Sequence, residues 1–325
     1  MSDFLTTTLP KFSQIFTSIA IFFAVLLLLF GVAGRVNGRA QRPLAIALFF
    51  GPAAILLIFG LVSPAIQTII YSFKDADGLA YIGFDNYTWM FQDENIHTVL
   101  INTVLWVIIT PIVTTAIGLT LAVLLDRMKH ESLPKSLIFM PMAISFVGAS
   151  IIWRFVYDYA KEGYPQTGLL TNLTRLIGKE PHNWMLENPL NTLLLMVIFV
   201  WVQTGFAMVI LSAAIKAVPS DIVEASALDG ASGMKLFRNI TFPMVRSTFT
   251  VVLATNVVGA LKLFDIVQTM TGGNFGTNVL ANEMYAQIFV QFNQGRGSAL
   301  AVALFLLVAP ILIYNIVHLR RERQH

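Results

Sequence analysis

The chain has 325 residues, of which 56% are hydrophobic and 12% are charged, with a net charge of +3 and no cysteine. A soluble domain carries about 25% charged residues. The composition therefore excludes a water-soluble globule and a disordered chain, and it argues against a nucleic-acid binder. The lack of cysteine excludes disulfides, thiol catalysis and cysteine-ligated metals. The high hydrophobic fraction and the low charged fraction fit a polytopic membrane protein.

Seven apolar runs are each long enough to cross a bilayer as a helix, for which about 20 residues are needed. They are, in chain order, residues 15–32, 44–70, 99–125, 137–156, 190–215, 247–264 and 299–317. A transmembrane barrel would instead show short segments of alternating polarity. Proline is expected to kink or interrupt the helices at four positions, namely Pro52, Pro64, Pro111 and Pro141.

The basic residues between the runs predict the orientation, because cytoplasmic loops carry an excess of lysine and arginine. One set of loops holds 13 basic residues and the opposite set holds 6. The larger set is Arg35, Arg39, Arg42, Arg127, Lys129, Lys135, Lys216, Lys235, Arg238, Arg246, Arg320, Arg321 and Arg323. Acidic residues collect in the opposite loops. The sequence thus predicts an all-α polytopic membrane protein of about seven transmembrane helices, with the N-terminus outside and the C-terminus inside.

The first apolar run has two interpretations. A cleaved signal peptide has a shorter apolar core that follows basic residues. Here the core is longer and the basic cluster comes after it, which favours a retained helix with its N-terminus outside. Six spans remain in either case. The predicted organisation is an N-terminal helix and basic loop over residues 1–43, a transmembrane domain over 44–318 and a cytoplasmic tail over 319–325.

The cytoplasmic segment 216–246 differs from the other loops, most of which are short or acidic. Pro219 ends the preceding span. Asp221, followed three residues later by Glu224, matches a capping box at the start of a helix. The residues up to Leu228 are good helix formers. The first half of the segment therefore predicts a short helix on the cytoplasmic face.

The second half of this segment contains the signals for a turn. Asp229-Gly230 breaks the helix, since glycine accepts left-handed backbone angles. Residues 234–239 are predicted to form a second short helix, and Pro243 marks the start of the next span. An ordinary surface loop is the alternative, but such a loop seldom combines these signals at this spacing. The pattern predicts a compact helix–turn–helix whose small turn residues let another protein approach closely.

These residues resemble the E-A-A-x-x-D-G-A…I-x-L-P loop of ABC importer permeases. The residues that match are Glu224-Ala225-Ser226, Asp229-Gly230-Ala231, Ile240 and Pro243. Further matching stretches are Trp201-x-x-x-Gly205-Phe206-x-Met208, Phe264-Asp265, Thr271-Gly272-Gly273 and Ile82-Gly83-Phe84-Asp85-Asn86-Tyr87. Over about residues 44–318 the chain looks like the maltose-type branch, whose members import oligosaccharides, glycerol phosphates and related polyols. It departs from the pattern at Ser226 and Phe242, and at Arg246, near where a proline is common.

The resemblance implies that the chain is the permease subunit of an ATP-driven importer in the cell membrane of a prokaryote. The implied substrate is a sugar, such as an α-glucoside. In that family the segment docks in a cleft of a cytoplasmic ATPase dimer. By match, Glu224 makes polar contacts, Ala225 and Ala227 permit close packing, and Gly230 forms the turn. The remaining members of the implied ATPase-coupling set are Asp229, Ala231 and Pro243.

The resemblance also implies the other partners. A second permease subunit, either a related chain or a copy of this one, completes the pathway, and an extracytoplasmic solute-binding protein delivers the sugar. ATP and Mg are expected in the ATPase subunits, because the Gly178-Lys179 pair has Leu173 where a phosphate-binding loop needs its first glycine. The five histidines lack paired ligand spacing. We therefore expect no cofactor, metal or catalytic site in this chain.

Polar side chains inside spans are costly and therefore mark candidate sites. A sugar requires amide hydrogen bonds and aromatic faces, and Gln203 with Phe206, three residues apart, can supply both from one helix face. By spacing from Glu224, the family's sugar-contact positions correspond to Gln203, Phe206, Asn256, Ala260 and Leu263. Most of the side chains differ from the family's. Alternatively, Gln203 and Asn256 only hold helices together.

Other classes of function fit less well. A stand-alone secondary transporter would show inverted repeats and carboxylates within its spans, and neither is found here. A membrane enzyme or scaffold is a third class, and no grouping of catalytic residues appears in the sequence to support it. Two outer features have open interpretations. Lys262 and Asp265 either pair or gate the outer mouth, and residues 271–276 form either a flexible loop or a surface that faces the binding protein.

Overall fold

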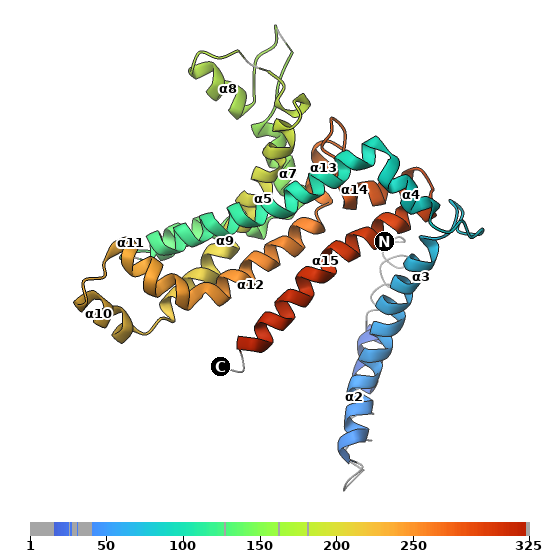
Figure 1. The fold of residues 1–325 in the computed structure, drawn as a ribbon, viewed down its shortest axis with the longest axis horizontal. Helices are drawn as coiled ribbons and strands as arrows, with labels where there is room; N and C mark the ends of the chain where they lie inside the picture. Colours follow the sequence, from blue (N-terminus) through green and yellow to red (C-terminus); the bar gives the residue numbers. More distant parts are fainter. Residues whose placement is uncertain are drawn as a thin grey trace, which may run out of the picture. The chain divides into compact units, whose positions relative to one another are not determined.

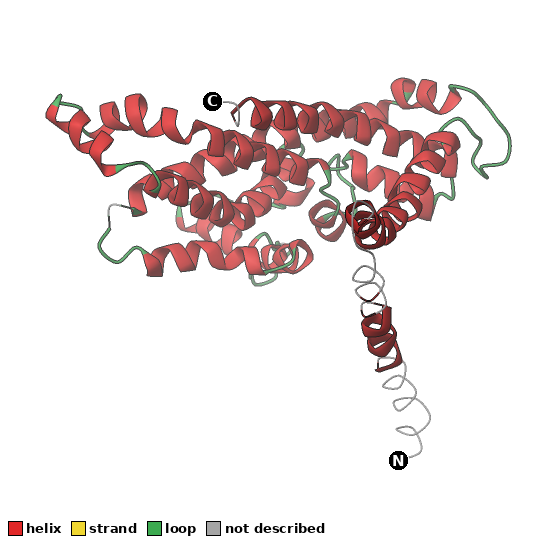
Figure 2. Cartoon of the chain, turned by 90° about the horizontal axis from the view of Figure 1, so that it is seen from below, coloured by secondary structure: helices red, strands yellow, loops and turns green. Residues whose placement is uncertain are grey.

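The structure is a computed structural model in which residues 16–25, 27, 31, 41–126, 128–161, 163–180 and 182–322 are described. Every regular element in these ranges is a helix (Figure 2). The only β pairing among these residues is an isolated bridge between Lys74 and Tyr81. The all-α class predicted from the sequence is confirmed for this part of the chain.

The chain divides into two units between Gln67 and Thr68. The described helices of the first unit begin with Phe16–Val25, α2 (Gln41–Leu57) and the π-helical turn η2 (Ile58–Val62). The division falls inside α3 (Ser63–Tyr71). Pro52 lies within α2 without ending it, and Pro64 follows the π-helical turn. Large apolar side chains such as Leu56 and Phe59 are more than 70% exposed along this helix, as a helix with an apolar environment requires.

The second unit contains the remaining helices (Figure 1). In chain order they are α4 (Asp85–Gln92), α5 (Glu94–Leu125), α6 (Ser132–Phe139), η3 (Met140–Ala143), α7 (Phe146–Val156), α8 (Leu169–Leu176), η4 (Trp184–Leu186), α9 (Leu190–Lys216), α10 (Ser220–Leu228), α11 (Gly233–Leu236), η5 (Phe237–Thr241), α12 (Phe242–Leu261), α13 (Asp265–Met270), α14 (Leu280–Tyr285), η6 (Ala286–Val290) and α15 (Gln294–Glu322).

Four helices of the described residues are long and apolar enough to cross a membrane, or five if one bent pair counts as a single span. The four are Ile46–Tyr71, Glu94–Leu125, Leu190–Lys216 and Gly233–Leu261. They coincide with four of the predicted runs. The last run lies in α15, whose apolar part is Gln294–Pro310. The first run extends beyond the described residues. The chain is therefore a multi-pass membrane protein, and the total of seven stays a prediction.

The fourth predicted run, residues 137–156, is not a straight helix. Its two halves, Ser132–Ala143 and Phe146–Val156, meet at an angle of 104°. Pro141 lies in the 3-10 turn at the break, where its missing N–H cannot continue a helical ladder. Ser145 is extended, and its hydroxyl accepts a hydrogen bond from the N–H of Gly148 at 3.1 Å, which starts α7. The interruption expected at Pro141 is confirmed, whereas Pro111 lies buried within a continuous α5.

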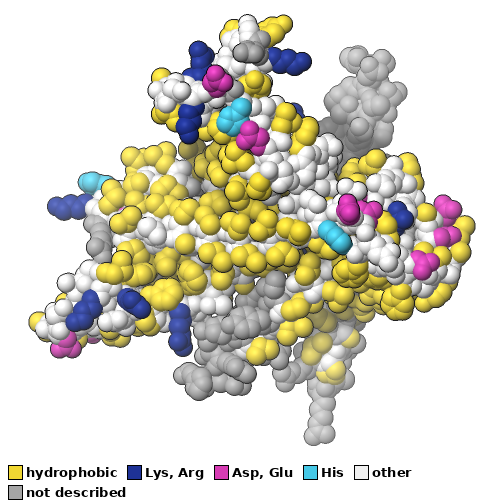
Figure 3. Space-filling view, turned by 45° about the horizontal axis from the view of Figure 1, so that its top comes forward, with side chains coloured by type: hydrophobic (Ala, Val, Ile, Leu, Met, Phe, Trp, Pro, Cys, Tyr) yellow, Lys and Arg dark blue, Asp and Glu magenta, His cyan; other side chains and the backbone are white. Residues whose placement is uncertain are grey.

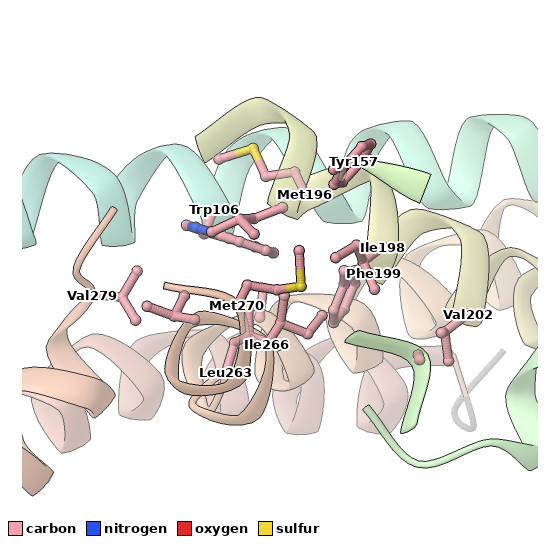
Figure 4. Close-up of a cluster of buried hydrophobic side chains, with 14 residues drawn as sticks. Trp106, Tyr157, Met196, Ile198, Phe199, Val202, Leu263, Ile266, Met270 and Val279 are labelled. Atoms are coloured by element: carbon pink, nitrogen blue, oxygen red, sulfur yellow. The ribbon is translucent and has the colours of Figure 1, made fainter. Parts of the chain in front are cut away.

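Helices α5, α9 and α12 pack on one another and form the centre of the second unit (Figure 1). Their halves nearer α13 (Asp265–Met270) enclose a cluster of buried side chains in which Trp106 meets Phe199 edge-on, with the ring centroids 6.3 Å apart (Figure 4). Further in, Gly118 of α5 lies directly against Ala207 of α9. A Cβ atom at Gly118 would lie 2.6 Å from that of Ala207. Small residues at a helix contact allow such close approach in membrane proteins.

Charged side chains gather at the ends of these helices. On the face in Figure 3, hydrophobic side chains cover the middle of the long helices, while lysine and arginine gather over the end formed by α10 and α11. Aspartate and glutamate gather toward the opposite end, around α4. This separation matches the opposed charge asymmetry of the loops, which is a feature of membrane proteins.

Candidate functional site

The segment 216–246 projects beyond the end of α9 as two short helices joined by a turn (Figure 1). Helix α10 ends at Leu228, and the amide of Gly230 then donates to the carbonyl of Ala227 at 3.0 Å. Gly230 has a φ of +81°, in the left-handed region that glycine adopts without strain. The helix break predicted at Asp229-Gly230 is therefore confirmed.

The predicted capping box is wrong. Helix α10 begins at Ser220 with Pro219 in the N-cap position, and no side chain caps it. The carbonyl of Pro219 accepts the first helical hydrogen bond, from the amide of Ile222 at 3.2 Å. Asp221 instead lies in the first turn, where its negative charge is stabilised by the helix dipole. The chain therefore enters the helix at Ser220, before the predicted cap at Asp221.

The second short helix is part of a longer one. Helix α11, the π-helical turn η5 and α12 form one continuous helical stretch, Gly233–Leu261. Pro243 is the second residue of α12, directly after η5, so it marks the start of that helix as predicted. π-Helical turns accommodate an irregular hydrogen-bond ladder and often lie at functional sites. The segment is therefore connected to α12 without a loop on its return side.

The residues assigned by resemblance to ATPase coupling lie on an accessible surface. Glu224, Ala227 and Leu228 share one face of α10. The Leu228 side chain is 90% exposed, and Met234 in the following helix is 75% exposed. The other exposed members of the set are Ala225, Asp229, Gly230 and Pro243, while Ala231 is half-buried. Small and apolar side chains around the carboxylates of Glu224 and Asp229 form a surface suited to close contact with a protein.

A polar cluster that sequence reasoning missed joins three helices at the base of this segment. Lys135 of α6 pairs with Asp126, which follows α5, and donates to the hydroxyl of Ser212 in α9 at 2.5 Å. That hydroxyl donates to the same Asp126 Oδ1 at 2.7 Å. Glu131 pairs with Lys135 at 2.7 Å and also with Lys216, the last residue of α9. We call these five residues the polar clamp.

The Glu131 carboxylate of the polar clamp is charged at neutral pH. Hydrogen bonds from the ammonium groups of Lys135 and Lys216 lower the pKa of Glu131 from 4.5 to about 2. A carboxylate with a lowered pKa contributes stability that is present above pH 4.5 and is lost as the pH falls toward about 2. The Glu131 carboxylate therefore holds both lysines throughout the physiological range.

The residues assigned by resemblance to the sugar pathway divide into two groups. Asn256, Ala260 and Leu263 are buried. The amide of Asn256 donates to the hydroxyl of Thr115 in α5 at 3.3 Å, and its Oδ1 has no partner among the described residues. Gln203 and Phe206 are half-buried on α9. The Gln203 amide lies beside Gly259, with its Nε2 3.9 Å from where a Cβ of that glycine would be. Only this second group reaches a surface.

This division predicts different outcomes for two alanine substitutions. Asn256→Ala removes the buried hydrogen bond to Thr115 and is expected to lower the stability of the purified protein by about 1 kcal/mol. Gln203→Ala removes a half-buried amide that forms no hydrogen bond among the described residues, and it is expected to change uptake kinetics while the melting temperature stays constant. Thermal unfolding in detergent and initial uptake rates in proteoliposomes measure the two effects. A loss of stability in Gln203→Ala with unchanged uptake would assign this residue to helix packing.

At the far end of the helices, side-chain amides hold the loop that joins α13 to α14. Asn102 of α5 donates to the carbonyls of Gly276 and Asn278 at 2.7 and 2.9 Å. Asn191 of α9 donates to the carbonyl of Phe275 at 2.9 Å. The glycine-rich loop is thus bound to two central helices. Among the described residues, Lys262 and Asp265 at this end form no ion pair.

Comparison with known proteins identifies the family. Residues 4–323 match the family described as the binding-protein-dependent transport system inner membrane component. The chain is 43% identical over 277 residues to an osmoprotective compounds uptake permease protein, GgtC, of Synechocystis, covering 85% of this chain and 99% of that protein. It is 42% identical over 301 residues to an α-glucoside transport system permease protein, AglF, of Rhizobium meliloti, covering 90% of each.

A solved structure has the same fold. A chain of a bacterial ABC transporter involved in the import of the acidic polysaccharide alginate aligns with a TM-score of 0.76 at 19% sequence identity. The alignment covers 86% of this chain and 96% of that one. The family match and the two permease relatives confirm the resemblance to ABC importer permeases seen in residues 224–243. The chain belongs to the family of binding-protein-dependent transport system inner membrane components.

Proposed function

We propose that this chain is the permease subunit of an ATP-driven importer that moves an α-glucoside-type sugar across the cell membrane of a prokaryote. It forms half of the translocation pathway, with the N-terminus outside and the C-terminus in the cytoplasm. The observation that carries the proposal is the exposed segment 216–246, which presents Glu224 and Gly230 beyond the ends of two long membrane helices. A helix of this kind can transmit movement between a soluble partner and the helices it joins.

The proposal assigns each partner to a surface of the chain. A cytoplasmic ATPase dimer, which binds ATP and Mg, docks on Glu224, Ala225, Ala227, Asp229, Gly230, Ala231 and Pro243. A second permease subunit, either a related chain or a copy of this one, encloses the other half of the pathway. An extracytoplasmic solute-binding protein delivers the sugar at the end that carries residues 271–276. This chain itself catalyses no reaction.

The α-glucoside assignment follows the relative from Rhizobium meliloti, which matches over 90% of its length. A second candidate is an osmoprotective compound, such as a small polyol, since the Synechocystis osmoprotective compounds uptake permease protein matches over 99% of its length. Both candidates are neutral, hydroxyl-rich solutes that need amide and aromatic contacts. Gln203, Phe206, Asn256, Ala260 and Leu263 are the positions proposed to line their path.

The test is reconstitution of the complete importer in liposomes with its ATPase, second permease and binding protein. We expect ATP hydrolysis and uptake to rise with α-linked disaccharides such as maltose, trehalose or sucrose. Cellobiose, which has a β-linkage and the same mass as maltose, is the matched control. If polyols stimulated ATP hydrolysis and uptake and no α-glucoside did, the substrate class would be polyols instead of α-glucosides. The absence of ATP-dependent uptake of any such solute would contradict the permease function.

A further inference from the structure

We call residues 216–246 the coupling segment. Its first helix, α10, has few direct contacts with the membrane helices, whereas Phe237 in its second half packs against buried residues of α5 and α9. Helix α10 packs chiefly on α11, its neighbour across the turn. Between α10 and the bundle lies a cavity of about 200 Å³. Its lining comes from the ends of α5 and α9, from α10, and from the η5 region, and includes Asp126, Ile215, Val223 and Phe237. A movement of α10 therefore reaches the bundle mainly through its two chain connections, α9 on one side and η5 with α12 on the other.

The α9 connection is the shorter of the two and lies at the polar clamp. Only Ala217, Val218 and Pro219 separate the end of α9 from the start of α10. Ser212 and Lys216, one turn apart in the last part of α9, both belong to the clamp. Ser212 contacts Asp126, which follows α5, and Lys135 of α6, whereas Lys216 pairs with Glu131, which directly precedes α6. The clamp thus binds the root of the coupling segment to two further helices.

Within the clamp, Lys135 is the residue with the most partners. Its ammonium contacts Asp126, Glu131 and Ser212, which uses all three of its donors. The Lys135 and Asp126 side chains are only 15% and 11% exposed. Asp126 Oδ2 is buried without a hydrogen-bond partner among the described residues. Removing the lysine charge would leave a buried carboxylate with one hydroxyl donor, which is far less favourable than an exposed broken pair.

We infer that Lys135 is a positioning residue that makes the end of α9, the end of α5 and α6 move as one body with the coupling segment. Two carboxylates and one hydroxyl from three elements converge on Lys135. A displacement of Lys216 by α10 is therefore transferred through Glu131 to Lys135, and from Lys135 to Asp126 and α6. Without the clamp, the same displacement bends the last turn of α9 into the adjacent cavity. This inference rests on the proposed coupling function of segment 216–246.

The first test measures coupling in the reconstituted importer. Lys135→Met keeps most of the side-chain volume and removes the charge, whereas Lys135→Arg keeps the charge. We expect Lys135→Met to consume at least about fivefold more ATP per imported maltose than the unchanged importer, with Lys135→Arg close to normal. Lys129→Met is the matched control, because Lys129 is exposed in the same loop and is outside the clamp. An unchanged ratio in Lys135→Met would overturn the inference.

The second test does not depend on a substrate. The chain contains no cysteine, so a single Leu228→Cys at the tip of α10 can carry a nitroxide label in the complete importer. We expect electron paramagnetic resonance spectra to report a more mobile label when Lys135→Met is added, and no change when Lys129→Met is added. Equal mobility of the label in the Lys135→Met and Lys129→Met importers would overturn the inference, even if the importer proved to carry another solute.

The third test replaces the clamp with a covalent link, in case Lys135→Met fails to fold. The side chains of Asp126 and Ser212 are in hydrogen-bond contact at 2.7 Å, so cysteines at both positions are neighbours, and the loss of free thiols on oxidation shows whether they link. Asp126→Cys with Ser212→Cys is expected to couple normally when oxidised and to lose coupling when a reductant is added. Equal coupling in both states would show that linkage between α5 and α9 is not needed.

Discussion

Replacing Gly230 with valine is expected to abolish sugar uptake while leaving the protein in the membrane. Gly230 has a φ of +81°, and a Cβ added there meets nothing within 4 Å. The cost is therefore conformational, and it amounts to about 1–2 kcal/mol for a residue forced into the left-handed region, with more for a β-branched side chain. That energy shifts an equilibrium about 5- to 30-fold. ATP-dependent uptake into proteoliposomes and ATPase co-purification measure the result.

A graded series separates backbone conformation from bulk at this turn. Asparagine has nearly the volume of valine but tolerates the left-handed region, so Gly230→Asn is expected to retain far more uptake than Gly230→Val. Gly178 provides the control. Gly178 also has a positive φ, +75°, and nothing lies within 4 Å of a Cβ added there. It follows α8 and lies outside segment 216–246. Equal loss in Gly178→Val, or full activity in Gly230→Val, would contradict the coupling role of the turn.

The second large effect is expected at the contact between α5 and α9. Gly118→Val places side-chain atoms where the Ala207 Cβ lies, and a Cβ alone would come within 2.6 Å of that atom and 2.9 Å of the Met208 backbone nitrogen. Overpacking a close contact costs about 1–3 kcal/mol, and here backbone must move. We expect a lower melting temperature in detergent and a smaller monodisperse fraction by size-exclusion chromatography.

A size exchange tests the geometry of this contact. Gly118→Ala is expected to destabilise the protein, and adding Ala207→Gly is expected to restore part of the loss, because the methyl group then has room. Gly51→Val is the control, since nothing lies within 4 Å of a Cβ at that position of α2. If the exchange brought no recovery, or if Gly51→Val were equally destabilising, close helix approach at Gly118 would not explain the effect.

Elements that depend on nearby residues could be predicted from the sequence. Apolar runs of sufficient length identified the long helices, and the Asp229-Gly230 pair identified the end of α10. The start of α10 was misplaced because two residues compete for it. Asp221 is a good cap, but the carbonyl of Pro219 already accepts the first helical bond. Pro141 signalled an interruption, yet no sequence rule yields the angle of 104°, which is set by the helices that pack on both arms.

Contacts between distant residues could not be predicted in the same way. Lys135 and Ser212 are 77 positions apart, and each is unremarkable in its own segment. The sequence assigns Lys135 to the basic residues of the predicted cytoplasmic loops. That assignment does not identify the residues with which Lys135 pairs. The signal that could have found the clamp is Asp126 at the very end of an apolar run, because a carboxylate there needs a cation. The buried hydrogen bond between Asn256 and Thr115 likewise depends on how α5 and α12 pack.

The loop between α13 and α14 that Asn102 and Asn191 hold has a consequence for the kinetics of partner binding. Ordering one backbone residue costs about 1–2 kcal/mol of conformational entropy. Because the carbonyls of Phe275, Gly276 and Asn278 are already bound by these amides, that entropy is lost when the chain folds. In the proposed orientation this loop faces the outside, so the proposed solute-binding protein would meet a surface that is already shaped, and each collision would have a higher chance of becoming a complex. We expect Asn102→Ala to slow such association, although Asn102 is buried and does not itself contact the arriving protein.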